Sequence, residues 1–337
     1  MTETDKLKVI ETIINRYTGL TEEIIYYNRK RGPIGKLLKQ YQWFKLYKNA
    51  ISSYIQHNDL PDLVHVHIPW KAGLIALWIK NKYGIPYIVT EHWGIYNRVL
   101  KDNYYSKPAY FKQIVKKTFE EAKVVTSVSK YLLEGLKQTA IIKSSRLIPN
   151  VVDTSLFYRK DLKHTKFSFI HVSNMVPLKN VSEILIAFRR LVAEEHLDVH
   201  LIMIGNPDDK YVKEAERMEL LNKNIFFRGE IKYKDVAEEM QRSHCLILNS
   251  FIENAPCVIS EALCCGLPVI ATSVGGVPEM INDSNGYLIE PGVDNLLRAM
   301  QSVLKDYERF DKQKISDIAK REYGYNIISE KFADLYA

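Results

Sequence analysis

Two glutamates, Glu253 and Glu261, are separated by seven residues in the stretch SFIENAPCVISEALCCG. Glu253 follows the apolar run CLILNS, and Pro256 suits the first turn of a helix because proline lacks the N–H that would be left unpaired there. Glu261 then lies one to two turns into that helix. Two carboxylates placed in this way could accept hydrogen bonds from the paired hydroxyls of a sugar or a ribose. Any single glutamate is more often an exposed surface residue, which is the alternative for each of them.

The ends of two other apolar runs carry residues that suit an anionic ligand. Lys179 and Asn180 follow the run FSFIHVS, and a helix is expected to begin at once after them. A lysine beside a helix N-terminus offers an anion a full positive charge and several free N–H groups. The run VHLIMIG ends at Gly205 and Asn206, where the absence of a Cβ lets a ligand approach the backbone. The alternatives are a solvated loop lysine and a plain turn glycine.

Apolar runs of strand length alternate with amphipathic segments of helix length along the whole chain. In the first half the predicted strands are 22–28, 62–68, 86–92, 123–129 and 145–152, and the predicted helices are 36–56, 71–83 and 108–121. In the second half the strands are 167–173, 199–205, 225–230, 245–250 and 268–272, and the helices are 180–195, 210–221, 233–242, 257–265 and 293–306. This alternation predicts an α/β protein of two doubly wound domains, with a boundary near 154–166. Such sheets bind ligands beyond the carboxyl ends of their strands.

Several classes of protein are disfavoured by motif and composition. No GxGxxG follows a predicted strand and no GxxxxGK[ST] occurs, so dinucleotide and P-loop sites are poorly supported. The chain has no apolar run of the roughly 20 residues that span a bilayer, and its start, MTETDKLKVIE, lacks the form of a signal peptide. We therefore expect a cytoplasmic protein. The four cysteines form no CxxC pair and are expected to be reduced, buried and free of metal: Cys245, Cys257, Cys264 and Cys265.

Charge is distributed unevenly between the two halves. Residues 1–160 hold 26 lysines and arginines against 13 aspartates and glutamates, whereas the rest of the chain holds 21 against 27. The first half is therefore expected to meet an anionic partner. Within it, residues 29–48 mix basic and aromatic residues in a pattern that suits either an interfacial helix on an anionic membrane or an ordinary amphipathic cover helix. The residues concerned are Lys36, Leu38, Lys39, Tyr41, Trp43, Phe44, Lys45, Tyr47 and Lys48.

Taken together, these features resemble the family 4 glycosyltransferases of the GT-B fold, which are retaining enzymes that use nucleotide sugars. The resemblance rests on Glu253 and Glu261 with EALCCGLPVIATSVGGVPEMI, on Lys179 in VPLKN, and on the stretches 148–157, 91–94 and 325–336. It covers nearly the whole chain. It implies an acceptor-side Rossmann-like domain at 1–157 and a donor domain at 158–317, facing each other across a cleft. A final helix at 318–337 would pack back on the first domain.

The resemblance also implies roles for individual residues. Lys179 would neutralise the donor diphosphate, Glu261 would bind the ribose hydroxyls and Glu253 the transferred sugar. His92 would lie in the cleft facing that sugar, although a histidine after a strand is more often a structural hydrogen-bonding residue. Arg228 would lie near the base, where a surface arginine is the simpler interpretation. The other residues expected at the donor are Asn174, which stands where the family commonly has an arginine, with Gly205, Asn206, Asn254, Ala255, Cys257 and Val258.

The implied reaction moves a hexose from a UDP- or GDP-linked donor to a glycan or lipid-linked acceptor in surface polysaccharide synthesis. It would proceed with retention, without an enzymic nucleophile, metal or cofactor. The protein would be cytoplasmic, with peripheral contact to the inner face of an anionic membrane through residues 29–48, and without a nucleic-acid partner. Two alternatives remain: a nucleotide-sugar epimerase on the same fold, and a non-catalytic nucleic-acid-binding protein that would account for the basic half.

The start of the chain departs from the resemblance. The family opens with a strand, a glycine-rich loop and a helix, whereas residues 7–20, LKVIETIINRYTGL, show helical spacing at Ile10, Ile13, Ile14 and Tyr17. We therefore expect a helix here and a missing first strand in the first domain. An upstream start or a truncated product would explain this departure.

Overall fold

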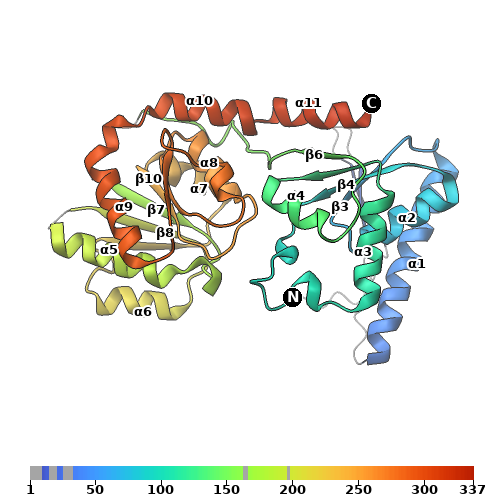
Figure 1. Cartoon of the computed structure of the whole chain (residues 1–337), viewed down its shortest axis with the longest axis horizontal. Coiled ribbons are helices and arrows are strands. Elements are labelled where there is room, and N and C mark those ends of the chain that lie inside the picture. Colours follow the sequence, from blue (N-terminus) through green and yellow to red (C-terminus); the bar gives the residue numbers. More distant parts are fainter. Residues whose placement is uncertain (1–9, 15–20, 26–32, 162–165, 196–197) are drawn as a thin grey trace.

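A computed structural model describes residues 10–14, 21–25, 33–161, 166–195 and 198–337. It contains two parallel sheets, each covered by helices, which lie side by side (Figure 1). We call the part around the four-stranded sheet the N-terminal lobe and the part around the six-stranded sheet the C-terminal lobe. The predicted fold, with two Rossmann-like α/β lobes, is confirmed.

The sheet of the N-terminal lobe has the strand order β3-β4-β5-β6, with all neighbours parallel. Its strands are β3 (Val64–His67), β4 (Tyr87–Glu91), β5 (Val124–Ser127) and β6 (Ser145–Leu147). The helices are α1 (Pro33–His57), α2 (Ala72–Tyr83), α3 (Ala109–Glu121) and α4 (Lys130–Lys137). Every residue of β4 is buried, as expected for a strand covered by helices on both faces.

The sheet of the C-terminal lobe has the order β12-β11-β10-β7-β8-β9, again with all neighbours parallel. Its strands are β7 (Ser168–Val172), β8 (His200–Ile204), β9 (Ile225–Gly229), β10 (Cys245–Leu248), β11 (Val269–Thr272) and β12 (Gly286–Ile289). Its helices are α5 (Val181–Glu195), α6 (Asp209–Arg217), α7 (Tyr233–Gln241), α8 (Cys257–Cys264), α9 (Val293–Asp306) and α10 (Lys312–Tyr323). The strand order changes direction between β7 and β10, and ligands bind at such a switch point in open α/β sheets.

The end of the chain crosses from one lobe to the other (Figure 1). Gly324 separates α10 from α11 (Tyr325–Tyr336), so the final helix expected at 318–337 is broken into two. Val152, which lies between the two sheets in the chain, binds this break, because its N–H donates to the Tyr323 carbonyl at 2.8 Å. α11 then packs on the N-terminal lobe, where the Tyr336 hydroxyl lies 2.7 Å from His65 Nδ1.

The helix expected from the spacing in 7–20 is wrong where the structure describes it. Residues Ile10–Ile14 form strand β1, which pairs antiparallel with β2 (Thr21–Ile25). Four of the five residues in IETII are β-branched, and such side chains favour strands over helices. The strand expected at 22–28 is described only as far as Ile25, and it pairs with β1 instead of joining the parallel sheet. Among the described residues that sheet begins with β3.

Several elements have different limits from those predicted, for local reasons. The strand expected at 145–152 ends at Leu147, since Pro149 cannot donate to a sheet. The helix expected at 210–221 ends at Arg217, and Glu219 follows with a positive φ of 57°. The chain forms a 3-10 turn at Val277–Glu279, after Gly276. Neither α4 nor β12 was predicted.

The described part of α1 uses its aromatic residues for packing. Trp43 is buried with Ile75 and Ile79 of α2, and Phe44 and Tyr47 pack against the same cluster. This arrangement matches the cover-helix interpretation for these three residues, whereas Tyr41 remains 67% exposed. None of the helices in the described residues is long and apolar enough to cross a membrane.

The four cysteines are free, and three of them are buried as predicted. Cys257 is exposed, so its expected burial is wrong. It is the first residue of α8, where the helix begins at the surface of the lobe.

Candidate functional site

The two strands at the switch point bring Lys179 and Glu253 together. Lys179 ends a 3-10 turn after β7, and Glu253 lies in the loop after the neighbouring strand β10. The Lys179 ammonium donates to Glu253 Oε1 at 2.5 Å, and the Ser250 hydroxyl donates to the same oxygen at 2.7 Å. The side chains are 22% and 10% exposed, so the pair is sheltered yet reachable. Because α5 begins two residues after Lys179, a positive charge and a helix N-terminus stand close to this carboxylate.

A turn of two glycines supports the Glu253 loop from behind. Gly275 has a φ of 58°, and an added Cβ would lie 1.7 Å from the Glu253 carbonyl oxygen. At Gly276 an added Cβ would lie 1.8 Å from the Asn254 carbonyl oxygen. No side chain fits at either position without moving the loop. The glycine turn therefore fixes the position of the loop that carries Glu253 and Asn254.

Glu261 lies inside the lobe and not on an exposed helix face. It is buried on α8, and its Oε1 accepts a hydrogen bond of 2.8 Å from the Tyr233 hydroxyl at the start of α7. Burial raises the pKa of the Glu261 carboxyl, and the hydrogen bond from Tyr233 partly opposes that shift. A buried carboxylate with one oxygen committed to a hydroxyl is suited to binding further hydroxyl groups.

His92 of the N-terminal lobe faces the Glu253 loop across a cavity of about 250 Å³. His92 and Gly94 line one side of this cavity, and Glu253, Asn254 and Ala255 line the other. The lobes also touch here, since the Asn254 amide donates to the His92 carbonyl at 3.2 Å. The structure thus places His92 and Glu253 around one cleft between the lobes, and Lys179 is joined to this cleft through its ion pair with Glu253.

Glu91 holds the backbone that carries His92. Its side chain is fully buried, and it accepts hydrogen bonds from the N–H groups of His92 and Trp93 and from the Tyr96 hydroxyl, at 2.7 to 2.8 Å. Burial raises the pKa of the Glu91 carboxyl to about 7, although the three hydrogen bonds act in the opposite direction. At pH values between the ordinary pKa of 4.5 and about 7, Glu91 therefore carries a proton in the folded protein and not in the unfolded chain.

This raised pKa predicts a specific pH dependence of stability. Between the ordinary pKa of 4.5 and about 7, the folded state holds a proton on Glu91 that the unfolded state has lost. The free energy of unfolding should therefore fall as pH rises through this window, by about 3 kcal/mol at most, and this contribution should be constant above it. Glu91→Gln can still accept the two N–H bonds and should remove this part of the slope. Urea unfolding at about pH 5 and about pH 8 measures it, and an equal slope in both proteins would contradict the assignment.

Four of the residues expected at the donor lie at the ends of strands β7, β8 and β9: Asn174, Gly205, Asn206 and Arg228. Gly205 has a φ of 131°, and an added Cβ would lie 1.7 Å from the Ser173 carbonyl oxygen, so packing alone requires a glycine there. Its N–H donates to the Gly229 carbonyl at 2.9 Å, which places it beside Arg228. Arg228, Asn174 and Asn206 are exposed, and none of the contacts described for these residues joins them to Glu253.

Sequence reasoning missed several residues of the site. Ser250 binds Glu253, Tyr233 binds Glu261, and the Asn150 amide donates to the Ala255 carbonyl at 3.0 Å. Asn150 stands in the stretch IPNVVD, which was part of the family resemblance, so a signal for it existed. Nothing in the local sequence marks Tyr233, whose partner lies 28 residues further along the chain.

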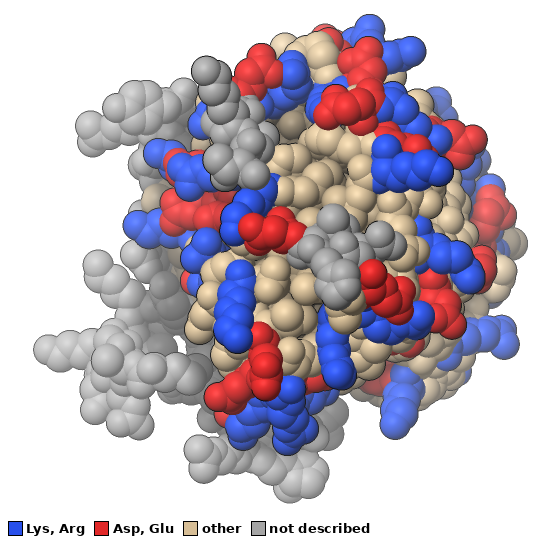
Figure 2. Space-filling model, turned by 90° about the vertical axis from the view of Figure 1, so that its left-hand side faces the viewer, with Lys and Arg blue, Asp and Glu red and all other residues tan. Residues whose placement is uncertain are grey.

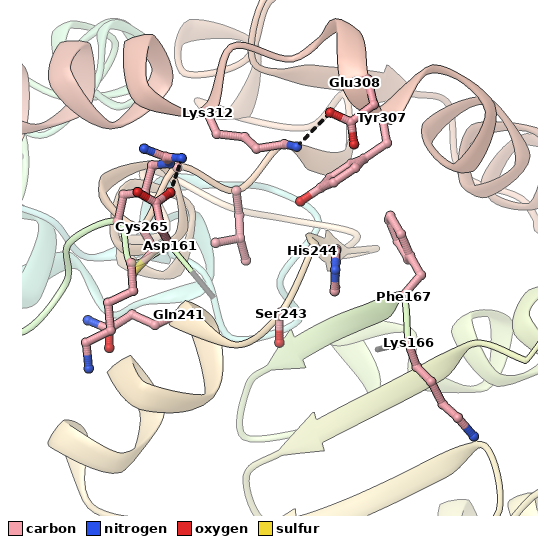
Figure 3. Close-up of a pocket in the computed structure, with 14 residues that line it drawn as sticks. Asp161, Lys166, Phe167, Gln241, Ser243, His244, Cys265, Tyr307, Glu308 and Lys312 are labelled. Atoms are coloured by element: carbon pink, nitrogen blue, oxygen red, sulfur yellow. Dashed lines mark hydrogen bonds and ion pairs between the residues drawn. The ribbon is translucent and has the colours of Figure 1, made fainter. Parts of the chain in front are cut away.

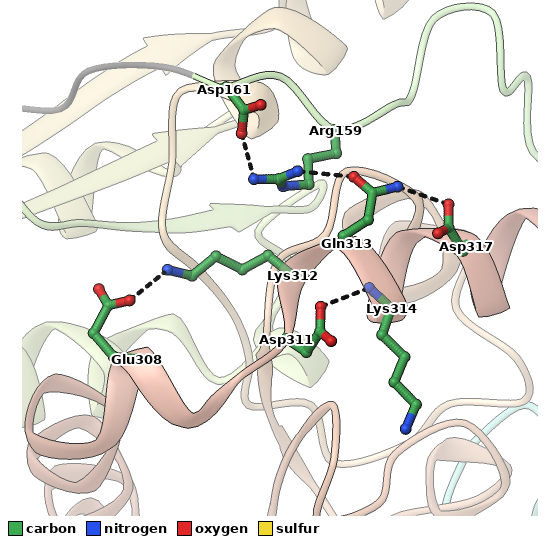
Figure 4. Close-up of polar contacts among 8 residues, drawn as sticks. All are labelled: Arg159, Asp161, Glu308, Asp311, Lys312, Gln313, Lys314 and Asp317. Atoms are coloured by element: carbon green, nitrogen blue, oxygen red, sulfur yellow. Dashed lines mark hydrogen bonds and ion pairs between the residues drawn. The ribbon is translucent and has the colours of Figure 1, made fainter.

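A second cavity, of about 420 Å³, lies at the amino ends of strands β7 and β10 in the six-stranded sheet (Figure 3). It is lined by residues that precede the strands, such as Phe167 before β7 and His244 before β10. Of its four cations, two pair with acidic residues that also line it (Figure 4): Arg159 binds Asp161, and Lys312 binds Glu308 at 3.3 Å. On the face of the C-terminal lobe shown in Figure 2, cations and anions are likewise interspersed. This cavity lies away from the carboxyl ends of the strands, where open α/β sheets bind their ligands.

Comparison with known proteins identifies the family of the chain. The family model described as "Glycosyl transferases group 1" matches residues 154–321, and "Glycosyltransferase Family 4" matches residues 10–156. The chain is 28% identical over 313 residues to N-acetyl-alpha-D-glucosaminyl L-malate synthase of Bacillus anthracis, covering 88% of this chain and 79% of that protein. It is 30% identical over 309 residues to an uncharacterised glycosyltransferase of Methanocaldococcus jannaschii, covering 87% and 79%.

A shorter match and two solved structures extend the comparison. The phosphatidylinositol N-acetylglucosaminyltransferase gpi3 subunit of Schizosaccharomyces pombe is 25% identical over 66% of this chain and 50% of its own length. Sucrose-phosphate synthase of Thermosynechococcus elongatus superposes with a TM-score of 0.79 at 19% identity, over 96% and 84% of the two chains. Anabaena HepE in complex with UDP superposes with a TM-score of 0.73 at 19% identity, over 86% and 81%.

The fold, the cleft and these matches define a GT-B glycosyltransferase. The chain belongs to glycosyltransferase family 4, whose two family models together match most of its length.

Proposed function

We propose that the chain is a retaining glycosyltransferase that moves a hexose from a UDP- or GDP-linked donor to a glycan or lipid-linked acceptor. The observation that carries this proposal is the Lys179–Glu253 pair at the switch point, facing His92 across the cleft between the lobes. A cation beside a helix N-terminus suits a diphosphate, and sheltered carboxylates suit the hydroxyls of a ribose and a hexose. Anabaena HepE, of similar fold, is described in complex with UDP, which supports a nucleotide sugar.

In this proposal each residue acts at a separate part of the donor. Lys179 has three N–H donors, so it can bind the diphosphate while it keeps its bond to Glu253. Glu261 holds the ribose, and Glu253 with the backbone of Asn254 and Ala255 holds the hexose. Arg228, Asn174, Gly205, Asn206, Cys257 and Val258 complete the donor side. His92 then contacts the hexose from the N-terminal lobe.

The transfer itself requires no nucleophile from the protein. The bond between the hexose C1 and the diphosphate oxygen breaks, and the nucleoside diphosphate leaves with the electron pair. The acceptor hydroxyl attacks C1 on the same face, and its proton passes to the leaving phosphate oxygen. Lys179 and the N-terminus of α5 stabilise the charge that develops on the diphosphate. This arrangement provides by itself the positive charge that a metal supplies in other transferases, so we propose a metal-independent reaction.

The names of relatives guide the choice of acceptor. One relative is named N-acetyl-alpha-D-glucosaminyl L-malate synthase and another a phosphatidylinositol N-acetylglucosaminyltransferase subunit. The second name falls within the proposed glycan or lipid-linked acceptor class. The assay pairs UDP- and GDP-linked hexoses with L-malate, phosphatidylinositol and a glycan, in EDTA, for wild type and Glu253→Gln. We expect one donor class to give a product with retained anomeric configuration by NMR. Inverted product, or transfer only with added metal, would contradict this mechanism, and epimerised donor without acceptor would favour the epimerase.

Contact with an anionic membrane is a separate part of the proposal, through the basic residues of 29–48. The exposed Lys45 is the part of this segment that can be tested from described side chains. Wild type should float with anionic vesicles and not with neutral ones, and Lys45→Ala should weaken binding about fivefold, since one lysine near such a surface contributes about 1 kcal/mol. Lys234→Ala, an exposed lysine of α7, is the control. Equal flotation with neutral vesicles would contradict this contact.

A further inference from the structure

The N-terminus of α4 in the N-terminal lobe is bound by a carboxylate from the C-terminal lobe. The N–H of Lys130 donates to Glu279 Oε2 and the N–H of Tyr131 to Glu279 Oε1, both at 2.8 Å. The third N–H of the helix, that of Leu132, donates to the Ser129 hydroxyl at 3.2 Å. The first three N–H groups of α4 are thus all satisfied, two of them by a side chain from the other lobe.

Glu279 reaches α4 because the turn that carries it is packed against the same point. Gly276 begins this turn, and an added Cβ there would lie 2.9 Å from Ser129 Cβ, the residue that caps α4. The turn and the helix start therefore touch directly, with no space for a side chain at position 276. This contact borders a cavity of about 500 Å³ between the lobes, which Ser129, Gly276 and Glu279 line together.

The same turn is joined to the Glu253 loop. Gly276 N–H donates to the Glu253 carbonyl at 3.3 Å, and Gly275 leaves no space between the turn and that carbonyl. An unbroken set of contacts therefore runs from the start of α4, through Glu279 and the glycine turn, to the backbone of Glu253. Two further hydrogen bonds between the lobes, from Asn254 to His92 and from Asn150 to Ala255, end on the same loop.

We propose that Glu279 is a positioning residue, which couples the approach of the two lobes to the placement of Glu253 in the cleft. When the lobes close, the carboxylate binds the positive end of α4 and the turn presses the Glu253 loop into place against the N-terminal lobe. When they open, the turn loses its support. This inference rests on the proposed function only in the role it gives Glu253, since the contact itself is between the lobes and needs no ligand.

Glu279→Gln is the sharpest test, because an amide can accept only one of the two N–H bonds and presents an N–H₂ to the other. Hydrogen exchange of the start of α4 should become faster in this variant. The dissociation constant for the donor nucleotide, bound by the C-terminal lobe, should stay within about twofold of wild type, whereas kcat should fall about tenfold, the effect of one charged hydrogen bond. Glu216→Gln, an exposed glutamate of α6 remote from the cleft, is the matched control and should change none of these.

The outcomes separate this inference from the proposed function. Unchanged exchange at α4, or faster exchange with an unchanged kcat, would overturn the positioning role. Failure of wild type to bind any nucleotide would overturn the proposed function, while loss of α4 protection in Glu279→Gln would still support the contact between the lobes. A fall in kcat that Glu216→Gln reproduces would also count against Glu279.

Discussion

Lys179→Ala is expected to lower kcat/KM for sugar transfer by about a thousandfold. Lys179 is the cation at the switch point of the C-terminal sheet, where a diphosphate would leave, and groups that stabilise charge in a transition state contribute about a hundredfold to a thousandfold each. The fold should survive, because Glu253 keeps its hydrogen bond from Ser250 at 2.7 Å. Steady-state kinetics with the donor identified by binding measure the effect.

Lys312→Ala provides a matched control for this prediction. Lys312 is 25% exposed and pairs with Glu308, much as Lys179 is 22% exposed and pairs with Glu253. It lines the second cavity, at the amino ends of the strands of the same sheet (Figure 3). Its removal should leave transfer unchanged. Equal losses in the two variants would show that general electrostatics, and not the switch point, explains the effect.

Gly275→Ala should disrupt the site through the backbone alone. An added Cβ would lie 1.7 Å from the Glu253 carbonyl oxygen, so the loop that carries Glu253 must move. A displacement of about 1 Å near reacting groups can lower a rate about a hundredfold, and we expect a loss of that size in kcat. The positive φ of 58° adds a strain of about 1 to 2 kcal/mol for alanine.

Gly84→Ala separates these two contributions. Gly84 ends α2 with a φ of 75°, and an added Cβ there would have no neighbour within 4 Å. It should therefore show the strain in a thermal unfolding experiment without any change in kcat. If Gly275→Ala changed kcat no more than Gly84→Ala, the glycine turn would not set the position of Glu253.

The sequence predicted the elements of this fold better than their arrangement. Apolar runs such as CLILNS and FSFIHV are fully or largely buried strands, and their length and composition identify them locally. That β7 and β10 are neighbours depends on contacts between residues 76 positions apart, which no local pattern encodes. The meeting of Lys179 and Glu253 follows from this pairing, so sequence patterns marked both residues as candidates but could not place them together.

The errors have physical causes of the same kind. Ile10, Ile13 and Ile14 fit helical spacing, but in so short a segment β-branched composition and pairing with β2 decide the outcome. The eight residues of α4 are too few for a periodic pattern to show. Glu279 binds the start of α4 from 149 residues away in the sequence, a contact that no local pattern encodes.

The central claim is that the C-terminal lobe binds a nucleotide sugar through Lys179 and Glu261. The most direct measurement is a thermal-shift panel of UDP, GDP, ADP and their hexose conjugates without metal, on wild type, Lys179→Ala, Glu261→Ala and Lys312→Ala. A ligand at about 100 times its Kd stabilises the folded state by about 2.7 kcal/mol. We predict that one nucleotide class raises the Tm of wild type and Lys312→Ala, and that the shift is lost in the other two variants. A shift that survives in Lys179→Ala and Glu261→Ala, or no shift with any nucleotide, would contradict the claim.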